Sequence, residues 1–163
     1  MRKQRIYLET TLFNYYFDTD RDAHADTVTL FKEIAAGKYE AFTSDAVVAE
    51  LMQAPAKKSA AMQALVEEYS ITILPVTDEA RRLTGIYISG GIIPQKYETD
   101  GIHIAVATVN KLDVIVSMNF RHIVKQKTIQ MTRTVNINNG YRPIEIFSPM
   151  EVIESEKTQY NRR

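Results

Sequence analysis

The chain of 163 residues contains no cysteine, and this absence removes several kinds of chemistry. Without a thiol the protein has no disulfide, no thiolate nucleophile and no cysteine-bound zinc site. Neither a Gly-x-Gly-x-x-Gly nor a Gly-x-x-x-x-Gly-Lys segment occurs, so a nucleotide-binding α/β domain is a poor interpretation. Any catalytic group must therefore be an oxygen or nitrogen side chain.

Long hydrophobic runs are also missing. The basic start of the chain, from Met1 to Arg5, is like the first part of a signal peptide, but Glu9 and Asn14 interrupt the apolar run that should follow it. No stretch approaches the roughly 20 apolar residues needed to cross a bilayer. We therefore expect a cytoplasmic protein.

Charge of one sign is not in excess, because 20 basic residues balance 20 acidic ones. The surface thus lacks the overall positive field by which most non-enzymatic nucleic-acid binders hold phosphates. Nucleic acid can still be a substrate, since a bound metal ion neutralises phosphate locally. No Ser, Gly or Pro tract divides the chain, so we expect one domain over residues 1–153 and a polar, flexible tail over 154–163.

What the sequence does contain is a regular alternation of strand and helix patterns. Strands are expected over residues 5–8, 39–43, 71–74, 113–117 and 144–147, and helices over 26–36, 45–52, 55–69, 77–91 and 99–109. The expected helix starts are Asp26, Ser44 or Asp45, Pro55, Thr77 or Asp78, and Thr99, and glycines 37, 90 and 91 are expected at helix ends. This order predicts an α/β fold whose mostly parallel sheet is covered by helices on both faces.

Polar side chains stand where such a sheet gathers its functional groups, at the carboxyl ends of strands. Glu9 follows the first expected strand and Asn119 follows the fourth, so both face one crevice if these strands are neighbours. Asp100 lies at the start of a helix, where the helix dipole helps to keep it ionised. Glu50 lies among the apolar residues of another helix, where a partner would be valuable.

Each of these residues also has a plainer interpretation. Asp100 can simply complement a helix dipole, Glu50 can be an exposed residue of a helix, and Glu9 can cap a turn. Three acids and an amide at strand ends and helix starts are nevertheless a combination that a random surface rarely provides.

The combination resembles the PIN-domain family, the fold of VapC-type toxin nucleases. The resemblance covers nearly the whole chain and rests on four blocks: Ile6-Tyr7-Leu8-Glu9-Thr10-Thr11, Ser44-Asp45-Ala46-Val47-Val48-Ala49-Glu50-Leu51, Thr99-Asp100-Gly101-Ile102-His103-Ile104-Ala105-Val106-Ala107 and Val116-Ser117-Met118-Asn119-Phe120. It implies a PIN-like three-layer α/β/α domain. It also implies a metal-dependent ribonuclease that hydrolyses RNA phosphodiester bonds.

The resemblance assigns Glu9, Glu50, Asp100 and Asn119 as the catalytic and metal-binding set for Mg²⁺ or Mn²⁺. Hard divalent ions prefer such oxygen ligands. Two positions depart from the family pattern, since Glu9 replaces a shorter Asp and the neutral Asn119 replaces a frequent Asp. The reduced charge favours one metal over two.

Several other polar residues near these blocks are weaker candidates. His103 lies on the same helical face as Asp100, but a structural hydrogen bond is the favoured role for it. Thr11 and Ser117 could hold a water or a phosphate, or simply form turns. The candidates for contact with the RNA backbone are Arg121, His122 and Lys125, which could equally form a solvated positive edge.

The leading hypothesis is the toxin half of a toxin-antitoxin pair, with RNA as substrate, an antitoxin protein as partner and a homodimer as a further expected assembly. The alternative is a catalytically weak or inactive PIN domain that binds RNA or protein. The aromatic run Phe13-Tyr15-Tyr16-Phe17 serves either a dimer surface or the core. Gly101, at a position where a small helix former is common, receives no role.

Overall fold

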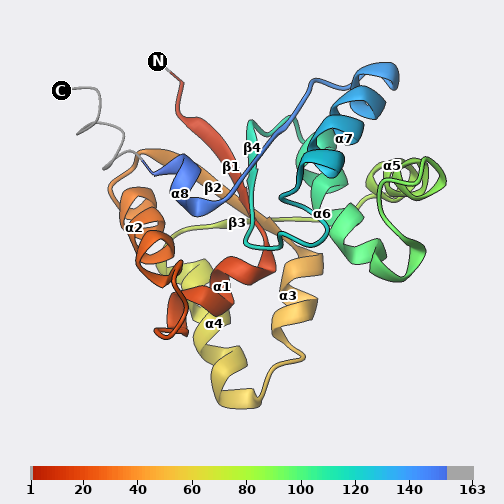
Figure 1. Ribbon diagram of the computed structural model, residues 1–163. Coiled ribbons are helices and arrows are strands. Elements are labelled where there is room, and N and C mark those ends of the chain that lie inside the picture. The colour runs from red at the N-terminus through yellow and green to blue at the C-terminus, as the bar shows by residue number, and fades with distance from the viewer. Residues whose placement is uncertain (1, 154–163) are drawn as a thin grey trace.

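The computed structural model of the protein describes residues 2–153, so the predicted tail over 154–163 lies outside the described residues. Within them, five strands form a wholly parallel sheet in the order β3-β2-β1-β4-β5 (Figure 1). The strands are β1 (Gln4–Leu8), β2 (Tyr39–Ser44), β3 (Thr72–Leu74), β4 (Val114–Val116) and β5 (Glu145–Phe147). The predicted α/β class is confirmed.

The helices form two groups around this sheet (Figure 1). Their bounds are α1 (Thr10–Phe17), α2 (His24–Ala35), α3 (Asp45–Leu51), α4 (Ala56–Glu68), α5 (Asp78–Ser89), α6 (Glu98–Val109), α7 (Gln126–Asn138) and α8 (Pro149–Val152), with a 3₁₀ turn η1 (Gln95–Tyr97) before α6. Helix α1 packs on α2 and α4, and α2 packs on α8, whereas α5 packs on α6 and α7. Helix α3 contacts both α1 and α6, so it joins the two groups at the carboxyl edge of the sheet.

Several helix starts and ends agree with the sequence expectations. Ser44 ends β2 and caps α3, because its hydroxyl accepts a hydrogen bond from the Val47 N–H. Thr77 caps α5 in the same way through the Ala80 N–H, and Gly90 ends that helix. These caps are short polar residues that satisfy the first free N–H groups of a helix.

Other expectations were wrong. Thr99 does not cap α6, because η1 runs directly into the helix and Tyr97 takes the cap position. Helix α2 begins two residues before Asp26, which lies in its first turn, and Pro55 precedes the first residue of α4. Helices α1 and α7 were not expected at all. Both are rich in Thr, Asn, β-branched or aromatic residues, which are weak helix formers.

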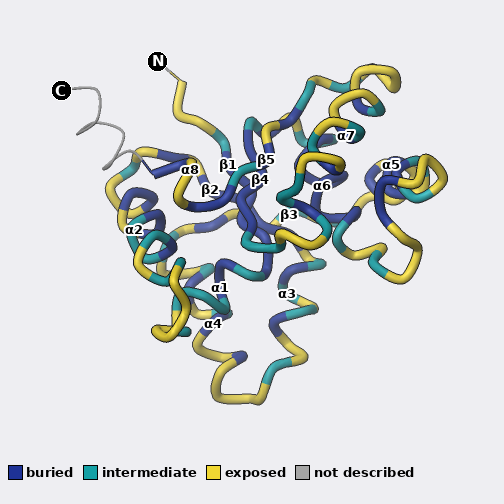
Figure 2. Tube along the Cα trace, viewed as in Figure 1, coloured by how far each residue is buried: buried dark blue, intermediate teal, exposed yellow. Residues whose placement is uncertain are grey.

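The core lies along the sheet and the helix faces turned toward it, where the chain is buried in Figure 2. The aromatic run in α1 mostly serves this core. Phe13 is fully buried, and the ring of Tyr16 packs edge-on against Phe31 at 5.0 Å and Tyr69 at 6.1 Å between centroids. Phe17 is the exception, with 41% of its surface exposed.

The structure explains why residue 101 is a glycine, which the sequence alone did not. It is buried in α6 where this helix approaches α5, and a Cβ atom there would lie 3.1 Å from Thr84 Cγ2. Thr84 is itself buried and its hydroxyl donates to the Ala80 carbonyl, which limits its freedom to move. The glycine therefore sets the distance between α5 and α6 just beside Asp100.

Asp113 stabilises the amino edge of the sheet, which lies opposite the carboxyl edge where Glu9 and Asn119 stand. Its carboxylate accepts hydrogen bonds from the Arg5 N–H at 2.7 Å and from the guanidinium groups of Arg2 and Arg142, both at 3.0 Å. Partial burial would raise the pKa of Asp113, but these donors outweigh it and hold the pKa below its usual value. No helix within residues 2–153 is long and apolar enough to span a membrane.

Candidate active site

The candidate site lies where β1 and β4 meet at the carboxyl edge of the sheet. Leu8 pairs with Val116, and the Glu9 N–H donates to the Val116 carbonyl at 3.1 Å, so Glu9 and Ser117 leave neighbouring strands side by side. The chain builds β2 and β3 on one side of β1 and β4 and β5 on the other. This reversal of strand order opens a crevice in parallel sheets, and the expectation that the two strands are neighbours is confirmed.

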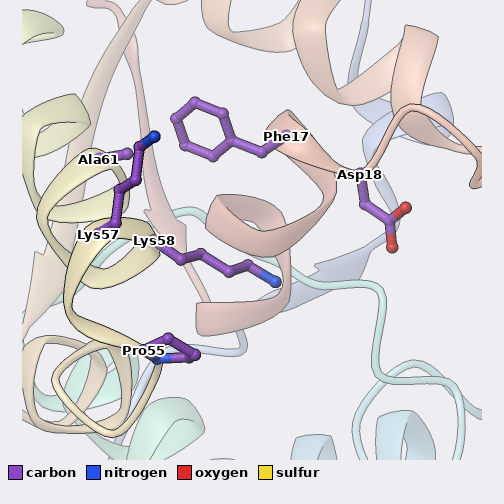
Figure 3. A pocket seen from close by; sticks show the side chains of 6 residues that line it. All are labelled: Phe17, Asp18, Pro55, Lys57, Lys58 and Ala61. Carbon is purple, nitrogen blue, oxygen red and sulfur yellow. The ribbon is translucent and has the colours of Figure 1, made fainter.

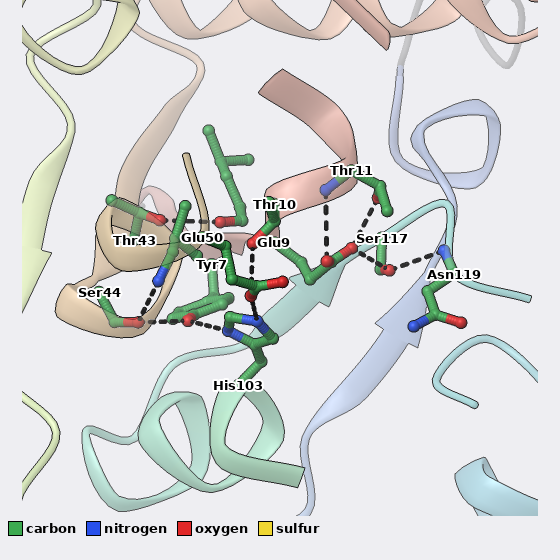
Figure 4. A network of polar contacts seen from close by, with 12 residues as sticks. Tyr7, Glu9, Thr10, Thr11, Thr43, Ser44, Glu50, His103, Ser117 and Asn119 are labelled. Carbon is green, nitrogen blue, oxygen red and sulfur yellow. Dashed lines mark hydrogen bonds and ion pairs between the residues drawn. The ribbon is translucent and has the colours of Figure 1, made fainter. Parts of the chain in front are cut away.

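Glu9 is buried at this junction, with only 3% of its surface exposed. Its Oε1 accepts hydrogen bonds from Ser117 Oγ at 2.5 Å and Thr11 Oγ1 at 2.6 Å, and its Oε2 accepts from the Thr11 N–H at 3.2 Å (Figure 4). The carboxylate thus caps α1 and joins the ends of β1 and β4 at once. Thr11 and Ser117, which the sequence suggested as water or phosphate contacts or as turn formers, both donate their hydroxyls to Glu9.

This burial decides the electrostatics of Glu9. Removal from water raises the pKa of the Glu9 carboxyl, and the nearby His103 together with the hydroxyl donors only partly opposes that rise. The negative charge of Glu50 raises it further. The carboxyl groups of Glu9 and Glu50 therefore interact electrostatically, and we describe them as neighbours in one acidic cluster.

Glu50 occupies the last turn of α3, with about a third of its side chain, 34%, exposed. Its Oε1 accepts from Thr10 Oγ1 at 2.8 Å and from His103 Nε2 at 2.6 Å (Figure 4). Partial burial would raise the pKa of Glu50, but the hydrogen bond and charge of His103 outweigh it, so the pKa is lowered. Glu50 is hence ionised at the mouth of the site and is not a freely exposed helix residue.

A buried chain of hydrogen bonds holds His103 in place. Its Nδ1 lies 2.7 Å from the Tyr7 hydroxyl, and that hydroxyl lies 2.7 Å from Ser44 Oγ. Burial alone would lower the pKa of His103, but Glu50 and the other acids raise it above the usual value. When protonated, the imidazolium donates through both nitrogens, one to Tyr7 and one to Glu50. Sequence reasoning missed Tyr7 and Thr10, since a buried strand tyrosine and a lone threonine carry no distinguishing pattern.

Asp100 completes the cluster from the first turn of α6 and is half-buried. Burial raises the pKa of its carboxyl, the imidazoles of His103 and His122 oppose that rise, Glu50 adds to it, and a hydrogen bond from the Asn119 side chain lowers it. The net pKa is raised even though helix starts usually favour the carboxylate. The structure therefore brings Asp100, Glu50 and Asn119 into one neighbourhood.

Asn119 is held by one hydrogen bond from its backbone and one to its side chain. Its N–H donates to Ser117 Oγ at 2.9 Å, and its Oδ1 accepts from the His122 N–H at 3.1 Å. Of the remaining predicted substrate contacts, Arg121 is exposed, and Lys125 stands at the N-cap position of α7 without a side-chain cap. Neither cation forms an ion pair with another of the residues the structure describes.

The oxygen donors of this site fit a divalent ion only in part. Within residues 2–153 no three acidic or histidine side chains stand close enough together to enclose an ion. A magnesium ion needs fewer, because it keeps several waters and rests on one or two carboxylates. Asp100, Asn119 and the Oε2 of Glu50, which accepts no hydrogen bond among the described residues, suit such an ion. Glu9 would reach it only through Oε2 or after its hydrogen bonds rearrange.

A separate hollow of about 640 Å³ lies between the end of α1 and the start of α4 (Figure 3). Its lining residues are Phe17, Asp18, Pro55, Lys57, Lys58 and Ala61. Asp18 pairs with Arg21 at 3.0 Å, whereas both lysines are exposed and have no ion pair within the described part of the chain. Phe17, Pro55 and Ala61 therefore give the hollow an apolar surface, and Lys57 and Lys58 give it positive charge.

The fold and the site together define a class of protein, namely a parallel α/β domain with a carboxylate cluster at its switch point. The family model for the PIN domain matches residues 6–126, which is well over half of the chain. The protein thus belongs to the PIN domain family. A comparison with curated proteins finds no match.

Solved structures of toxins share this fold. The chain is 12% identical to VapC20 of Mycobacterium tuberculosis, a toxin that cleaves the sarcin-ricin loop, with a TM-score of 0.53 over 86% of this chain and 98% of the toxin. It is also 12% identical to a chain of the VapBC2 complex of Rickettsia felis bound to a promoter DNA fragment, with a TM-score of 0.56 over 89% and 98% of the two chains. At this identity the likeness shows the fold alone.

Proposed function

We propose that the protein is a metal-dependent endoribonuclease of the VapC toxin kind. The observation that carries the proposal is the half-buried Asp100, whose pKa is raised by burial and by Glu50 at the point where the strand order reverses. Acids with perturbed pKa values in a crevice are favoured candidates for function. Membership of the PIN domain family supports the same conclusion.

In this proposal Glu50, Asp100 and Asn119 hold a Mg²⁺ or Mn²⁺ ion, and the buried Glu9 fixes the ends of β1 and β4 through its hydrogen bonds with Thr11 and Ser117. When bound, the ion supplies an activated water and polarises the scissile phosphate. The protein's own residues prepare this arrangement. His103 and Thr10 hold Glu50 through Oε1 and leave Oε2 without a hydrogen bond among the described residues, and Asn119 positions Asp100 through its amide. Arg121 and Lys125 lie on the loop beside Asn119 and can neutralise RNA phosphates.

The decisive experiment compares two aspartates that both lie in the first turn of a helix. Asp100→Asn should abolish RNA cleavage with Mg²⁺ without unfolding the protein, whereas Asp78→Asn at the start of α5 should leave cleavage unchanged. Circular dichroism of both variants checks the fold. Equal cleavage of structured RNA by the wild-type protein and Asp100→Asn would overturn the assignment.

A second candidate function is a PIN domain that binds RNA or protein without cutting. It is favoured by the hydroxyl contacts that occupy Glu9 and by the neutral Asn119. Calorimetric titration with Mn²⁺ separates the two functions. Heat that Glu50→Gln abolishes supports the enzyme, and no heat at millimolar metal supports the binding module.

We further propose an antitoxin as the protein partner, as in the VapBC2 complex that shares the fold. The hollow between α1 and α4 suits a segment with apolar and acidic side chains, because exposed Phe17 lies beside the exposed lysines Lys57 and Lys58. The product of a neighbouring reading frame should co-purify with the wild-type protein. It should be lost with Lys57→Glu and Lys58→Glu combined, but not with Lys127→Glu on α7.

A further inference from the structure

An aromatic pair lies at the rim of the acidic site. Tyr97 immediately precedes α6, three residues before Asp100, and His122 lies three residues after Asn119. Their rings stack with 3.9 Å between centroids and 28° between planes. The pair therefore bridges the two segments that carry Asp100 and Asn119.

His122 is fixed to the site on its backbone side. Its N–H donates to Asn119 Oδ1 at 3.1 Å, and Asn119 in turn donates to Asp100. Burial raises the pKa of Asp100, and His122 is among the groups that oppose this rise, so its ring lies within the field of that carboxyl. A ligand on this pair would hence be a direct neighbour of a group held by Asp100.

The polar atoms of the two rings are left unused. Among the residues that the structure describes, neither the Tyr97 hydroxyl nor an imidazole nitrogen of His122 makes a hydrogen bond, and both side chains are half-buried. Lys96 Nζ lies 5.1 Å from the Tyr97 ring centroid, and Arg121 is exposed next to His122. Stacked rings whose polar atoms have no partner in residues 2–153, with two nearby cations, match the way proteins bind unstacked bases of single-stranded RNA.

We propose that Tyr97 and His122 form a nucleobase subsite, on which a base next to the scissile phosphate stacks while Lys96 and Arg121 face the RNA backbone. The inference rests on the proposed nuclease function and adds the recognition of single-stranded nucleotides to it. A competing role is purely structural, in which the stack only braces the loop after β4 against α6. In that case the pair would affect stability but would not distinguish RNA with bases from RNA without them.

The test measures fluorescence anisotropy of a labelled, short, unstructured RNA in EDTA, so that no cleavage occurs. Tyr97→Ala should weaken binding by about 5- to 100-fold, the range expected from the loss of one stacked base. Tyr97→Phe keeps the ring and should bind within about twofold of the wild-type protein. Tyr15→Ala is the matched control, because Tyr15 is also half-buried with a cation, Arg21, 5.3 Å from its ring centroid, but lies at the far end of α1.

A second probe keeps the proposal testable if Tyr97→Ala folds poorly. The same RNA with abasic residues should bind the wild-type protein more weakly than the intact RNA, by a factor similar to that for Tyr97→Ala. Equal affinity for the two RNAs, or unchanged affinity in a folded Tyr97→Ala, overturns the subsite.

Cleavage kinetics separate this failure from failure of the nuclease assignment. If the wild-type protein cuts RNA, Tyr97→Ala should raise KM with little change in kcat, and an unchanged KM counts against the subsite alone. If no cleavage occurs but Tyr97→Ala still weakens binding of the intact RNA, the nuclease assignment fails and the base subsite stands.

Discussion

The buried hydroxyl of Tyr7 offers a test of how the acidic site is held. Tyr7→Phe removes the group that joins Ser44 Oγ and His103 Nδ1, each 2.7 Å away. A buried imidazole N–H would then lack an acceptor, which costs about 1–3 kcal/mol, in addition to the second hydrogen bond at about 1 kcal/mol. We expect a loss of about 2–4 kcal/mol in the free energy of unfolding. This corresponds to a fall in Tm of about 4–16 °C for a domain of this size.

The matched control is Tyr87→Phe. Tyr87 is also fully buried, and its hydroxyl donates to Asn136 Oδ1 on α7 at 2.6 Å. Both variants should lose similar stability in thermal unfolding. Only Tyr7→Phe should also weaken Mn²⁺ binding and RNA cleavage, by about 10- to 100-fold, because a partner that orients a ligand residue has been loosened. Equal Mn²⁺ affinities in the two variants would refute the positioning role of His103.

Four further substitutions should change stability in directions that depend on the position, the pH or the presence of metal. Gly101→Ala should lower the free energy of unfolding by about 1–3 kcal/mol through crowding against α5, whereas Gly85→Ala, which meets nothing within 4 Å, should raise it by about 0.5–1 kcal/mol in chemical denaturation. Asp113 has a lowered pKa, so its contribution to stability is present above the unfolded value of about 3.9 and is lost as pH falls through the folded value. The Tm deficit of Asp113→Asn should therefore shrink below about pH 4, and a deficit that stays constant contradicts this. Asn119→Asp places a second carboxylate beside Asp100, so it should lower Tm in EDTA but increase the Tm gain on adding Mn²⁺. A smaller gain than that of the wild-type protein counts against an ion at this position.

The parts of the fold that were predictable are those with a local signal. Ser44, Thr77 and Gly90 mark helix ends by their own chemistry, and the apolar strands alternate clearly with the long helices. Helix α7 was not predicted because its buried face carries the polar residues Thr128, Thr132 and Asn136, so it lacks the hydrophobic periodicity by which helices are recognised. Tertiary packing, rather than propensity, makes that segment helical.

The sequence could predict which acids lie near one another, but it could not predict the hydrogen bonds that hold them. Acid residues after strands and at helix starts suggested Glu9, Glu50 and Asp100 as a group, and the packing of α3 against α6 brings Glu50 and Asp100 near each other and near Glu9. The partners of these acids could not be predicted, because Tyr7 and His103 meet only once α6 is folded against β1. Whether the acids hold an ion stays a prediction.

The hydrogen bond between Ser117 and Glu9 joins residues 108 positions apart along the chain, and the one between His103 and Glu50 spans 53. Contacts of such separation form late, since a long loop must close before they stabilise anything. During synthesis Glu9 leaves the ribosome well before Ser117, so its carboxylate stays unburied until β4 has been made and has paired with β1. The acidic site therefore cannot assemble on a partial chain. For a protein proposed to attack RNA, this order of assembly delays activity until synthesis has passed β4.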